Sequence, residues 1–339
     1  MRTYLLPESG NDYKANLHCH STLSDGKMTL EELKERYTAK GYSIIAFTDH
    51  DIFLPHPELA DENFLPLHGF EVEINEVIPE GTVAQKRKTC HMCFIALDPE
   101  TIHQPCWHRS RYQFGNAIGN RDKVQFDDTL PDYERKYSHE GISDMVRIGR
   151  EKGFFVTYNH PTWSQESYPQ YIGYEGLNAM EIVNSACVVM GFEDHNGRVY
   201  DDMLRSGKKL YCIAADDTHH AKDCFGGFTV IRAPKLEYRT VTDALVKGDF
   251  YCSEGPVIRD LWYEDGKVTV TVEGAREITM ARGIRRAGIA RAGETPLTEA
   301  SFNVFPEDEY IRIVVTDYSG KCAYTNAYFT ADFIKSSEN

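Results

Sequence analysis

The sequence predicts an α/β domain over residues 1–255 and a smaller all-β module over residues 256–339. Three observations support this prediction. Short apolar runs alternate with amphipathic segments up to residue 255, several of these runs end in histidine or aspartate, and from about Pro256 apolar and polar residues alternate. Repeated βα units indicate a parallel sheet, and side chains that converge from many strand ends favour a barrel over a doubly wound sheet.

Eight apolar runs predict buried strands, and amphipathic helices lie between several of them. The runs are KANLHCH from residue 14, SIIAFTDH from 43, LHGFEVEI from 67, HMCFIAL from 91, FFVTYNH from 154, AMEIVN from 179, KLYCIAAD from 209 and GFTVIRA from 227. A helix begins after Thr29, where Glu32 completes a capping-box pattern, and Gly41 ends it. Apolar residues at helical spacing predict further helices around 142–149 and 199–204.

Two stretches depart from this alternation. Residues 98–138 show no clear periodicity, so we expect an insertion that lies over the mouth of the barrel as a lid. Its aromatic residues have two interpretations, a small satellite core or a platform on which a base stacks. From residue 256 the runs KVTVTVEG and YIRIVVTDYSG, with turn signals between the runs, predict a small β-sandwich.

Composition excludes some functions. The net charge of −15 argues against nonspecific binding of a long nucleic acid, which depends on many Lys and Arg contacts, but it allows a small anion at a metal site. No apolar run reaches the roughly 18 residues of a membrane span, and the N-terminus lacks a signal-peptide pattern. We therefore expect a cytoplasmic protein with no membrane partner. The nine cysteines show no disulfide spacing, so we expect most to be reduced and buried.

Side chains that ligate metals end most of the apolar runs. His18 and His20 lie two residues apart on one strand and therefore face the same side, and Asp217 and His219 repeat this spacing. The full set of candidate ligands is His18, His20, Asp25, His50, Glu71, His91, His160, Asp217 and His219. These imidazoles and carboxylates suit two to three divalent ions, Zn, Mn or Fe, which act as Lewis acids and as a source of hydroxide.

Each motif taken alone also has a structural interpretation. A single HxH pair is a weak signal, and only the joint occurrence of all the motifs indicates a metal centre. The C-x-x-C of Cys90 and Cys93 lacks the second pair that a zinc ribbon needs, so we expect both thiols in the core beside His91. Asp216 is a neighbouring candidate, but the D-x-H spacing selects Asp217.

Together these motifs resemble the PHP superfamily, the polymerase and histidinol phosphatase metal-dependent phosphoesterases. The resemblance rests on HCHSTLSDG, FTDHD, the Glu of GFEVE, the NHP at 159–161 and the DDTH at 216–219, and it covers about residues 14–255. It implies a distorted (β/α)7 barrel with a trinuclear site at its C-terminal mouth. The implied ligand sets are His18, His20, Glu71 and Asp217 for one ion, Glu71, His91 and His160 for a second, and Asp25, His50 and His219 for a third.

The resemblance implies a metal-dependent phosphoesterase that hydrolyses a small phosphomonoester, with a nucleotide or short oligonucleotide among the candidates. A metal-bridging hydroxide attacks phosphorus in this hypothesis, with Asp25, Glu71 and Asp217 as catalytic residues. The short TLSDG loop is similar to that of stand-alone phosphoesterases that act on nucleotides. Arg109, Arg111 and Arg198 are candidate clamps for the phosphate, and the alternative is that they are solvated surface charges.

Two other functions remain open. The β-rich C-terminal module resembles a domain appended to PHP hydrolases of another group, some of which cleave other esters or carbamates. The same centre therefore suits a hydrolase of carboxylic esters or carbamates. A non-catalytic, metal-stabilised binding module is a further alternative, and the complete set of nine ligands argues against it.

Overall fold

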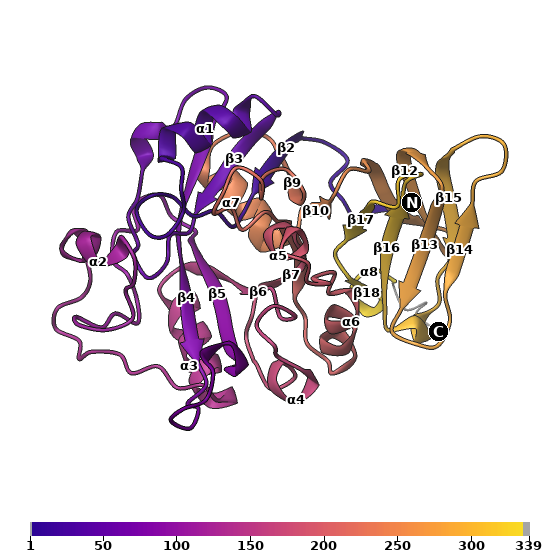
Figure 1. Cartoon of the computed structure of the whole chain (residues 1–339). Coiled ribbons are helices and arrows are strands. Elements are labelled where there is room, and N and C mark those ends of the chain that lie inside the picture. Colours follow the sequence, from indigo (N-terminus) through magenta and orange to yellow (C-terminus); the bar gives the residue numbers. More distant parts are fainter. Residues whose placement is uncertain (1, 335–339) are drawn as a thin grey trace.

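The computed structural model describes residues 2–334 as a larger α/β region that lies beside a smaller β-sandwich (Figure 1). The strands of the α/β region are β2 (Asn11–Asn16), β3 (Tyr42–Phe47), β4 (Leu65–Asn75), β5 (Thr89–Ala96), β6 (Phe154–Asn159), β7 (Ala179–Asn184), β8 (Tyr211–Ala215), β9 (Phe228–Ala233) and β10 (Phe250–Ser253). Its helices are α1 (Leu30–Thr38), α2 (Ala117–Asn120), α3 (His139–Glu151), α4 (Tyr168–Tyr171), α5 (Ser185–Val189), α6 (Gly197–Arg205) and α7 (Tyr238–Lys247). Each strand predicted for this region is present.

The sheet of the α/β region is mixed, so the prediction of a purely parallel sheet is wrong. Strands β2, β3 and β4 are parallel, as are β6, β7 and β8, but β5 runs antiparallel to both β4 and β6. The loop between β4 and β5 contains no α-helix, and a strand that returns without a crossover helix must run antiparallel. Strand β9 is likewise antiparallel to β2.

No closed ring of hydrogen-bonded strands appears among residues 2–334, since the order runs openly from β10 through β9, β2, β3, β4, β5, β6 and β7 to β8. A single parallel bridge between Cys19 and Thr218 nevertheless joins the segments that follow β2 and β8. The segments that follow β2 and β8 therefore approach each other at the edge where the metal-ligand motifs lie.

The helices follow the sequence pattern closely. Thr29 caps α1, with the predicted reciprocal bonds to Glu32, and the helix ends at Thr38, ahead of Gly41. The buried face of α3 carries Ile142, Met145, Val146 and Gly149. A side chain at Gly149 would place its Cβ 2.3 Å from the ring of Phe94, so the missing side chain allows α3 to pack closely on β5.

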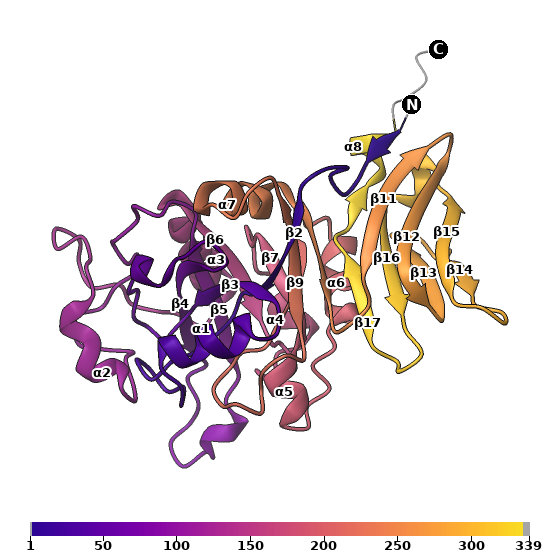
Figure 2. The same ribbon diagram turned by 90° about the horizontal axis from the view of Figure 1, so that it is seen from above.

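The C-terminal sandwich pairs two sheets that face each other (Figure 2). Its strands and last helix are β11 (Ile258–Glu264), β12 (Lys267–Ala275), β13 (Glu277–Arg282), β14 (Gly288–Arg291), β15 (Leu297–Asn303), β16 (Tyr310–Thr316), β17 (Cys322–Thr325), β18 (Tyr328–Phe329) and α8 (Thr330–Phe333). One apolar core joins the sheets, with Leu261 and Val270 from one and Ile278 and Ile313 from the other, all fully buried. The predicted sandwich is therefore present.

The sandwich is tied to the α/β region at two places. The N-terminal strand β1 (Thr3–Tyr4) pairs with β11, and β10 pairs with β9 on one side and β17 on the other. One sheet thus runs from the α/β region into the sandwich. The domain boundary at residue 255 stays a prediction, and residues 335–339 of the predicted module lie outside the described part of the chain.

The insertion, residues 98–138, lies at the end of the molecule opposite the sandwich, where α2 is seen in both views (Figures 1 and 2). Trp107 packs with Ile52, Ala117 and Val124 in a small separate core, and its ring stacks on Phe126. This confirms the satellite-core interpretation for Trp107. Between residues 2 and 334, no helix is long and apolar enough to span a bilayer.

Candidate metal centre

Backbone pairing brings the three histidine-rich motifs together at one edge of the sheet. The backbone N–H of His20 donates to the carbonyl of Thr218 (3.0 Å), and that of Thr48 donates to the carbonyl of Cys19 (2.8 Å). The HCH segment after β2 therefore lies between the TDH segment after β3 and the DDTH segment after β8. These are the C-terminal ends of parallel strands, where sites assembled from distant segments are commonly found.

The middle of the sheet supplies Glu71, His91 and His160. Glu71 lies within β4, His91 near the start of β5, and His160 directly after β6. Because β5 is antiparallel to its neighbours, its beginning lies at the same edge as the ends of the parallel strands. Because β5 is reversed, His91 at its start lies beside ligands that follow the ends of the parallel strands.

Four buried side chains form the first ligand group, and they are His18, His20, Glu71 and Asp217. The Nε2 atoms of His18 and His20 lie 3.0 Å apart, and both lie within 3.3 Å of an oxygen of Glu71 and of Asp217. The structure thus brings together the four residues of the first predicted ligand set, and their role as ligands stays a prediction.

Glu71 faces two groups of histidines, one with each carboxylate oxygen. Its Oε2 lies 3.2 Å from His18 Nε2 and 3.3 Å from His50 Nε2. Its Oε1 lies 3.2 Å from His91 Nδ1 and 3.4 Å from His160 Nε2. A carboxylate placed in this way can bridge two ions, which is the role that the sequence predicts for Glu71.

Asp25 stands at the outer side of the cluster, in a group with His20, His50 and His219. Its Oδ2 lies 3.3 Å from His219 Nε2 and 3.9 Å from His50 Nε2. The loop that carries it folds back tightly, because a Cβ on Gly26 would lie only 2.5 Å from the carbonyl oxygen of His20. The structure therefore adds His20 to the residues predicted around the third ion.

The electrostatics of the cluster fit a metal centre. Burial alone would raise the pKa of Glu71, but His18, His91 and His50 hold that pKa well below its ordinary value. Likewise, His18 and His20 outweigh burial and hold the pKa of Asp217 low. Both carboxylates are thus kept in the ionised form that ligates a metal.

Unpartnered atoms in the cluster also fit bound cations. Buried polar atoms normally find a partner, yet His20 Nδ1, His50 Nδ1, both ring nitrogens of His91 and Asp217 Oδ1 have no hydrogen-bond partner among residues 2–334. Imidazole and carboxylate together are the donor set that Zn, Mn and Fe accept. The residues present therefore fit divalent ions.

Hydrogen bonds to buried groups orient the ligands, and one of these groups, Glu181, was not identified in the sequence analysis. His18 Nδ1 donates to Glu181 Oε1 (2.7 Å), which leaves His18 Nε2 facing the cluster. His219 Nδ1 donates to the backbone carbonyl of Asp217 (3.0 Å), with the same effect on His219 Nε2. Glu181 is fully buried on β7, and the signal that marks it is a carboxylate in the middle of the apolar run AMEIVN.

Other candidates lie outside the cluster. Asp216 accepts hydrogen bonds from the backbone N–H groups of Phe225, Gly226 and Gly227, so it braces a loop and does not face the cluster's histidines. Cys90 and Cys93 are fully buried, as predicted, and all nine cysteines are free.

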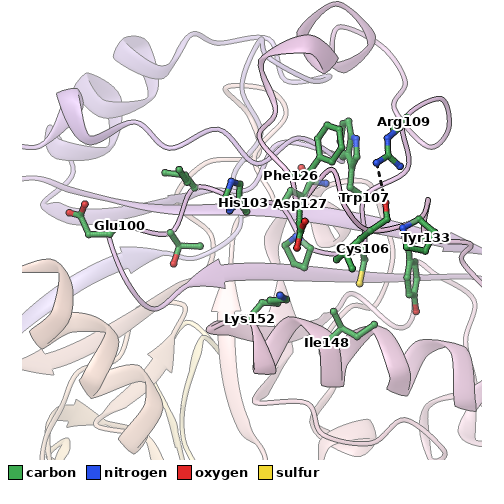
Figure 3. Close-up of a pocket in the computed structure, with 16 residues that line it drawn as sticks. Glu100, His103, Cys106, Trp107, Arg109, Phe126, Asp127, Tyr133, Ile148 and Lys152 are labelled. Carbon is green, nitrogen blue, oxygen red and sulfur yellow. Dashed lines mark hydrogen bonds between the residues drawn. The ribbon is translucent and has the colours of Figure 1, made fainter.

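The three arginines proposed as phosphate clamps each pair with a carboxylate. Arg109 pairs with Asp132, Arg111 with Glu134, and Arg198 with Asp202. Arg109 also lines a cavity of about 450 Å³ between the insertion and the end of α3 (Figure 3), which shares no lining residue with the metal cluster. Their role in binding substrate stays a prediction.

A pocket of about 500 Å³ opens directly onto the metal cluster. The insertion contributes Phe114 to the lining of this pocket. The ring centre of Phe114 lies 4.8 Å from that of His50. The remaining walls come from Lys27, Glu73, Trp163, Ala186, Cys187, Met190, His220, Lys222 and Asp223. The cluster is therefore accessible to a small molecule.

Parts of this chain are similar in sequence or structure to known proteins. A DNA polymerase/3'-5' exonuclease PolX of Bacillus subtilis (strain 168) is 34% identical over 88 residues, which span 21% of this chain and only 15% of that relative. A two-domain protein of Bacteroides vulgatus ATCC 8482, described as containing a predicted PHP-like metal-dependent phosphoesterase, matches 96% of this chain and 98% of its own at 14% identity and a TM-score of 0.43. An amidohydrolase from Chromobacterium violaceum matches 60% of this chain and 87% of its own, at 16% identity and a TM-score of 0.40.

The family assignment rests on the sequence match to the PHP domain. That match covers residues 16–188, just over half of the 339 residues. It includes seven of the nine clustered side chains, and Asp217 and His219 join them from beyond β8. With this match and the cluster that it spans, the chain belongs to the PHP domain family.

Proposed function

We propose that this chain is a metal-dependent phosphoesterase that hydrolyses a small phosphomonoester. The observation that carries the proposal is the position of Glu71, whose two oxygens face separate groups of histidines. Asp25 and His219 add a third group. A centre with three ligand groups offers separate positions for a nucleophile and for several phosphoryl oxygens, whereas a planar carbonyl needs only one polarised oxygen.

The ligands would hold two to three divalent ions, which supply Lewis-acid activation of water and of the phosphoryl group when bound. The side chains themselves have distinct tasks. Glu71 and Asp217 provide ionised carboxylates in the interior of the site, and the buried histidines are held in position by hydrogen bonds such as that from His18 to Glu181. At the mouth, His219 holds the pKa of Asp25 below its ordinary value in spite of burial, which favours Asp25 as a ligand.

We further propose that strands β2 to β8 enclose the site as a distorted seven-stranded barrel. The support is the bridge between Cys19 and Thr218, which joins the segments after the first and last of these strands. In such an arrangement the ligands would converge on one mouth from nearly every strand.

The test is release of phosphate by protein loaded with Mn, Zn or Fe. The panel contains phosphomonoesters, nucleotides, phosphodiesters and aryl carbamates, and nucleotides are included because the Bacillus subtilis relative is described as a polymerase and exonuclease. Inorganic phosphate and vanadate should inhibit competitively, and His18→Ala should abolish phosphate release. Turnover of an aryl carbamate or ester, without release of phosphate from any member of the panel, would overturn the proposal.

A further inference from the structure

The pocket over the metal cluster combines cationic and apolar side chains. Lys27 and Lys222 line it together with the clustered ligands and with the carboxylates of Glu73 and Asp223, while Phe114, Trp163 and Met190 form much of its apolar wall. A ligand that fills this pocket therefore meets positive charge and apolar surface as well as the metal ligands.

The two lysines lie in the loops that carry the outermost ligands. The backbone N–H of Lys27 donates to the carbonyl of His219 (2.9 Å), so Lys27 is held next to the group of Asp25. Lys222 follows His219 by three residues, in a turn where the carboxylate of Asp223 accepts from the backbone N–H groups of His219 and His220. Both lysines thus start from fixed backbone positions.

Neither lysine forms an ion pair with the described part of the chain. No carboxylate of residues 2–334 lies within 4.0 Å of the amine of Lys27 or Lys222, whereas Arg109, Arg111 and Arg198 each hold one. A lysine ammonium offers three donors and binds phosphate as a point charge. In a chain with a net charge of −15, two unpaired cations beside a metal cluster indicate that the substrate is an anion.

The apolar wall of the pocket has two parts, the ring of Trp163 beside the histidine ligands and a group of exposed apolar side chains at the end of α5. The ring centre of Trp163 lies 5.4 Å from that of His91 and 5.0 Å from that of His160, both edge-on. At the end of α5, Met190 is 51% exposed and its neighbours Val189 and Phe192 are 48% and 38% exposed. Clustered exposed apolar side chains next to a pocket are typical of a surface that a ligand covers.

We infer that Lys27 and Lys222 bind the phosphoryl group and that the leaving group is an aromatic ring, which rests on Trp163 and Met190. This inference depends on the proposed phosphoesterase function and specifies its substrate class as an aryl or similarly planar phosphomonoester. A pocket of about 500 Å³ accommodates a phosphate with a compact ring system. Trp163 and Met190 determine specificity in this arrangement, and the two lysines position the anion.

Binding of two phosphonates, which are not turned over, tests the inference. The manganese-loaded protein is titrated with phenylphosphonate and methylphosphonate by calorimetry. Phenylphosphonate should bind about tenfold more tightly, because part of the apolar surface of its ring is buried. Trp163→Ala should remove this preference and leave the affinity for methylphosphonate unchanged, and Trp163→Leu repeats the test with a larger apolar side chain.

The lysines are tested with the same two probes. Lys27→Met combined with Lys222→Met should weaken both phosphonates by the same factor, about tenfold, because the charge that both probes share is lost. Lys152→Met, which removes a lysine of the cavity between the insertion and α3, is the matched control and should change neither affinity. Metal content by elemental analysis should be equal in all these variants.

The outcomes separate this inference from the proposed function. Equal affinities of the unchanged protein for the two phosphonates would overturn the aromatic leaving group, and unchanged binding by the double lysine variant would overturn the phosphoryl contact. Failure of the phosphoesterase proposal shows instead in the hydrolysis panel, as an absence of phosphate release. Turnover of alkyl and aryl phosphates at equal kcat/KM would also contradict the inference while leaving phosphoester hydrolysis intact.

Discussion

His18 Nδ1 lies 2.7 Å from Glu181 Oε1, and neither side chain is exposed to solvent. Glu181 also accepts a hydrogen bond from the backbone N–H of His160 (2.9 Å) and another from the side chain of Asn184 (2.8 Å). One carboxylate on β7 therefore holds a ligand from the β2 segment and the segment after β6 in place.

Glu181→Gln should weaken metal binding without removing a ligand. The amide can no longer hold the His18 ring as a charged acceptor, and loss of such a partner commonly lowers metal affinity by about 10- to 100-fold. Competition with a chelator, followed by elemental analysis, measures the change. Glu193→Gln changes an exposed glutamate of the same region and should have no effect. An affinity equal to that of the unchanged protein would show that Glu181 does not orient His18.

Glu71→Gln should disturb more of the metal centre than any other single ligand change, because Glu71 faces both histidine groups. We expect it to lose more than one equivalent of metal, whereas His91→Ala should lose one. Elemental analysis after purification without chelator measures both. Loss of only one equivalent from Glu71→Gln would refute the bridging role.

Asp49→Asn should loosen the loop that carries Asp25. The buried carboxylate of Asp49 accepts from the backbone and hydroxyl groups of both Ser21 and Ser24, at 2.7–3.1 Å. An amide cannot accept all four bonds, so we expect a loss of about 1–3 kcal/mol in the free energy of unfolding and weaker metal binding beside Asp25. Denaturant unfolding gives the first quantity, and Asp61→Asn, an exposed change, is the control. A stability equal to that of the control would contradict this role.

His68 should make the stability depend on pH, away from the metal ligands. It is buried on β4, neither ring nitrogen has a hydrogen-bond partner among residues 2–334, and burial lowers its pKa from 6.5 to about 4. As the pH falls, His68 is therefore protonated at a higher pH in the unfolded chain than in the folded protein. The free energy of unfolding is therefore unaffected by His68 above pH 6.5, and it decreases as the pH falls from 6.5 toward 4.

His68→Leu should remove this dependence. Between pH 7.5 and pH 5.5 the unchanged protein should lose on the order of 1 kcal/mol more than the variant in the free energy of unfolding. Urea unfolding at the two pH values measures the difference. Identical pH profiles for the two proteins would show that His68 is not responsible.

Much of the candidate site could be predicted because ligands follow a strand-end pattern. Imidazoles and carboxylates that close apolar runs stand out in the sequence, and all nine gather in the structure. The direction of β5 was predicted wrongly, although the residues between Asn75 and Thr89 show no helical spacing and contain the turn signal of Pro79 and Gly81. His91 nevertheless lies in the cluster, because the start of an antiparallel strand lies at the same edge as the ends of its parallel neighbours.

Contacts between side chains distant in sequence were harder to predict. Arg109 and Arg111 suggested phosphate clamps, but their carboxylate partners lie 23 residues away along an irregular segment, which no periodicity reveals. For Lys27 and Lys222, the feature that matters is a missing contact with a carboxylate. Their proposed role depends on the absence of a nearby carboxylate among residues 2–334, and only the three-dimensional arrangement reveals it.

The pairing of β1 with β11 has a consequence for how the protein is made. Thr3 pairs with Tyr263 and Tyr4 with Trp262, so the partners are separated by about 260 residues. At a synthesis rate of roughly 5–20 residues per second, the first strand waits roughly 13–50 seconds before its partner leaves the ribosome. Until the two meet, β11 forms an open edge of its sheet, and that edge can accept a strand from a second nascent chain in place of β1.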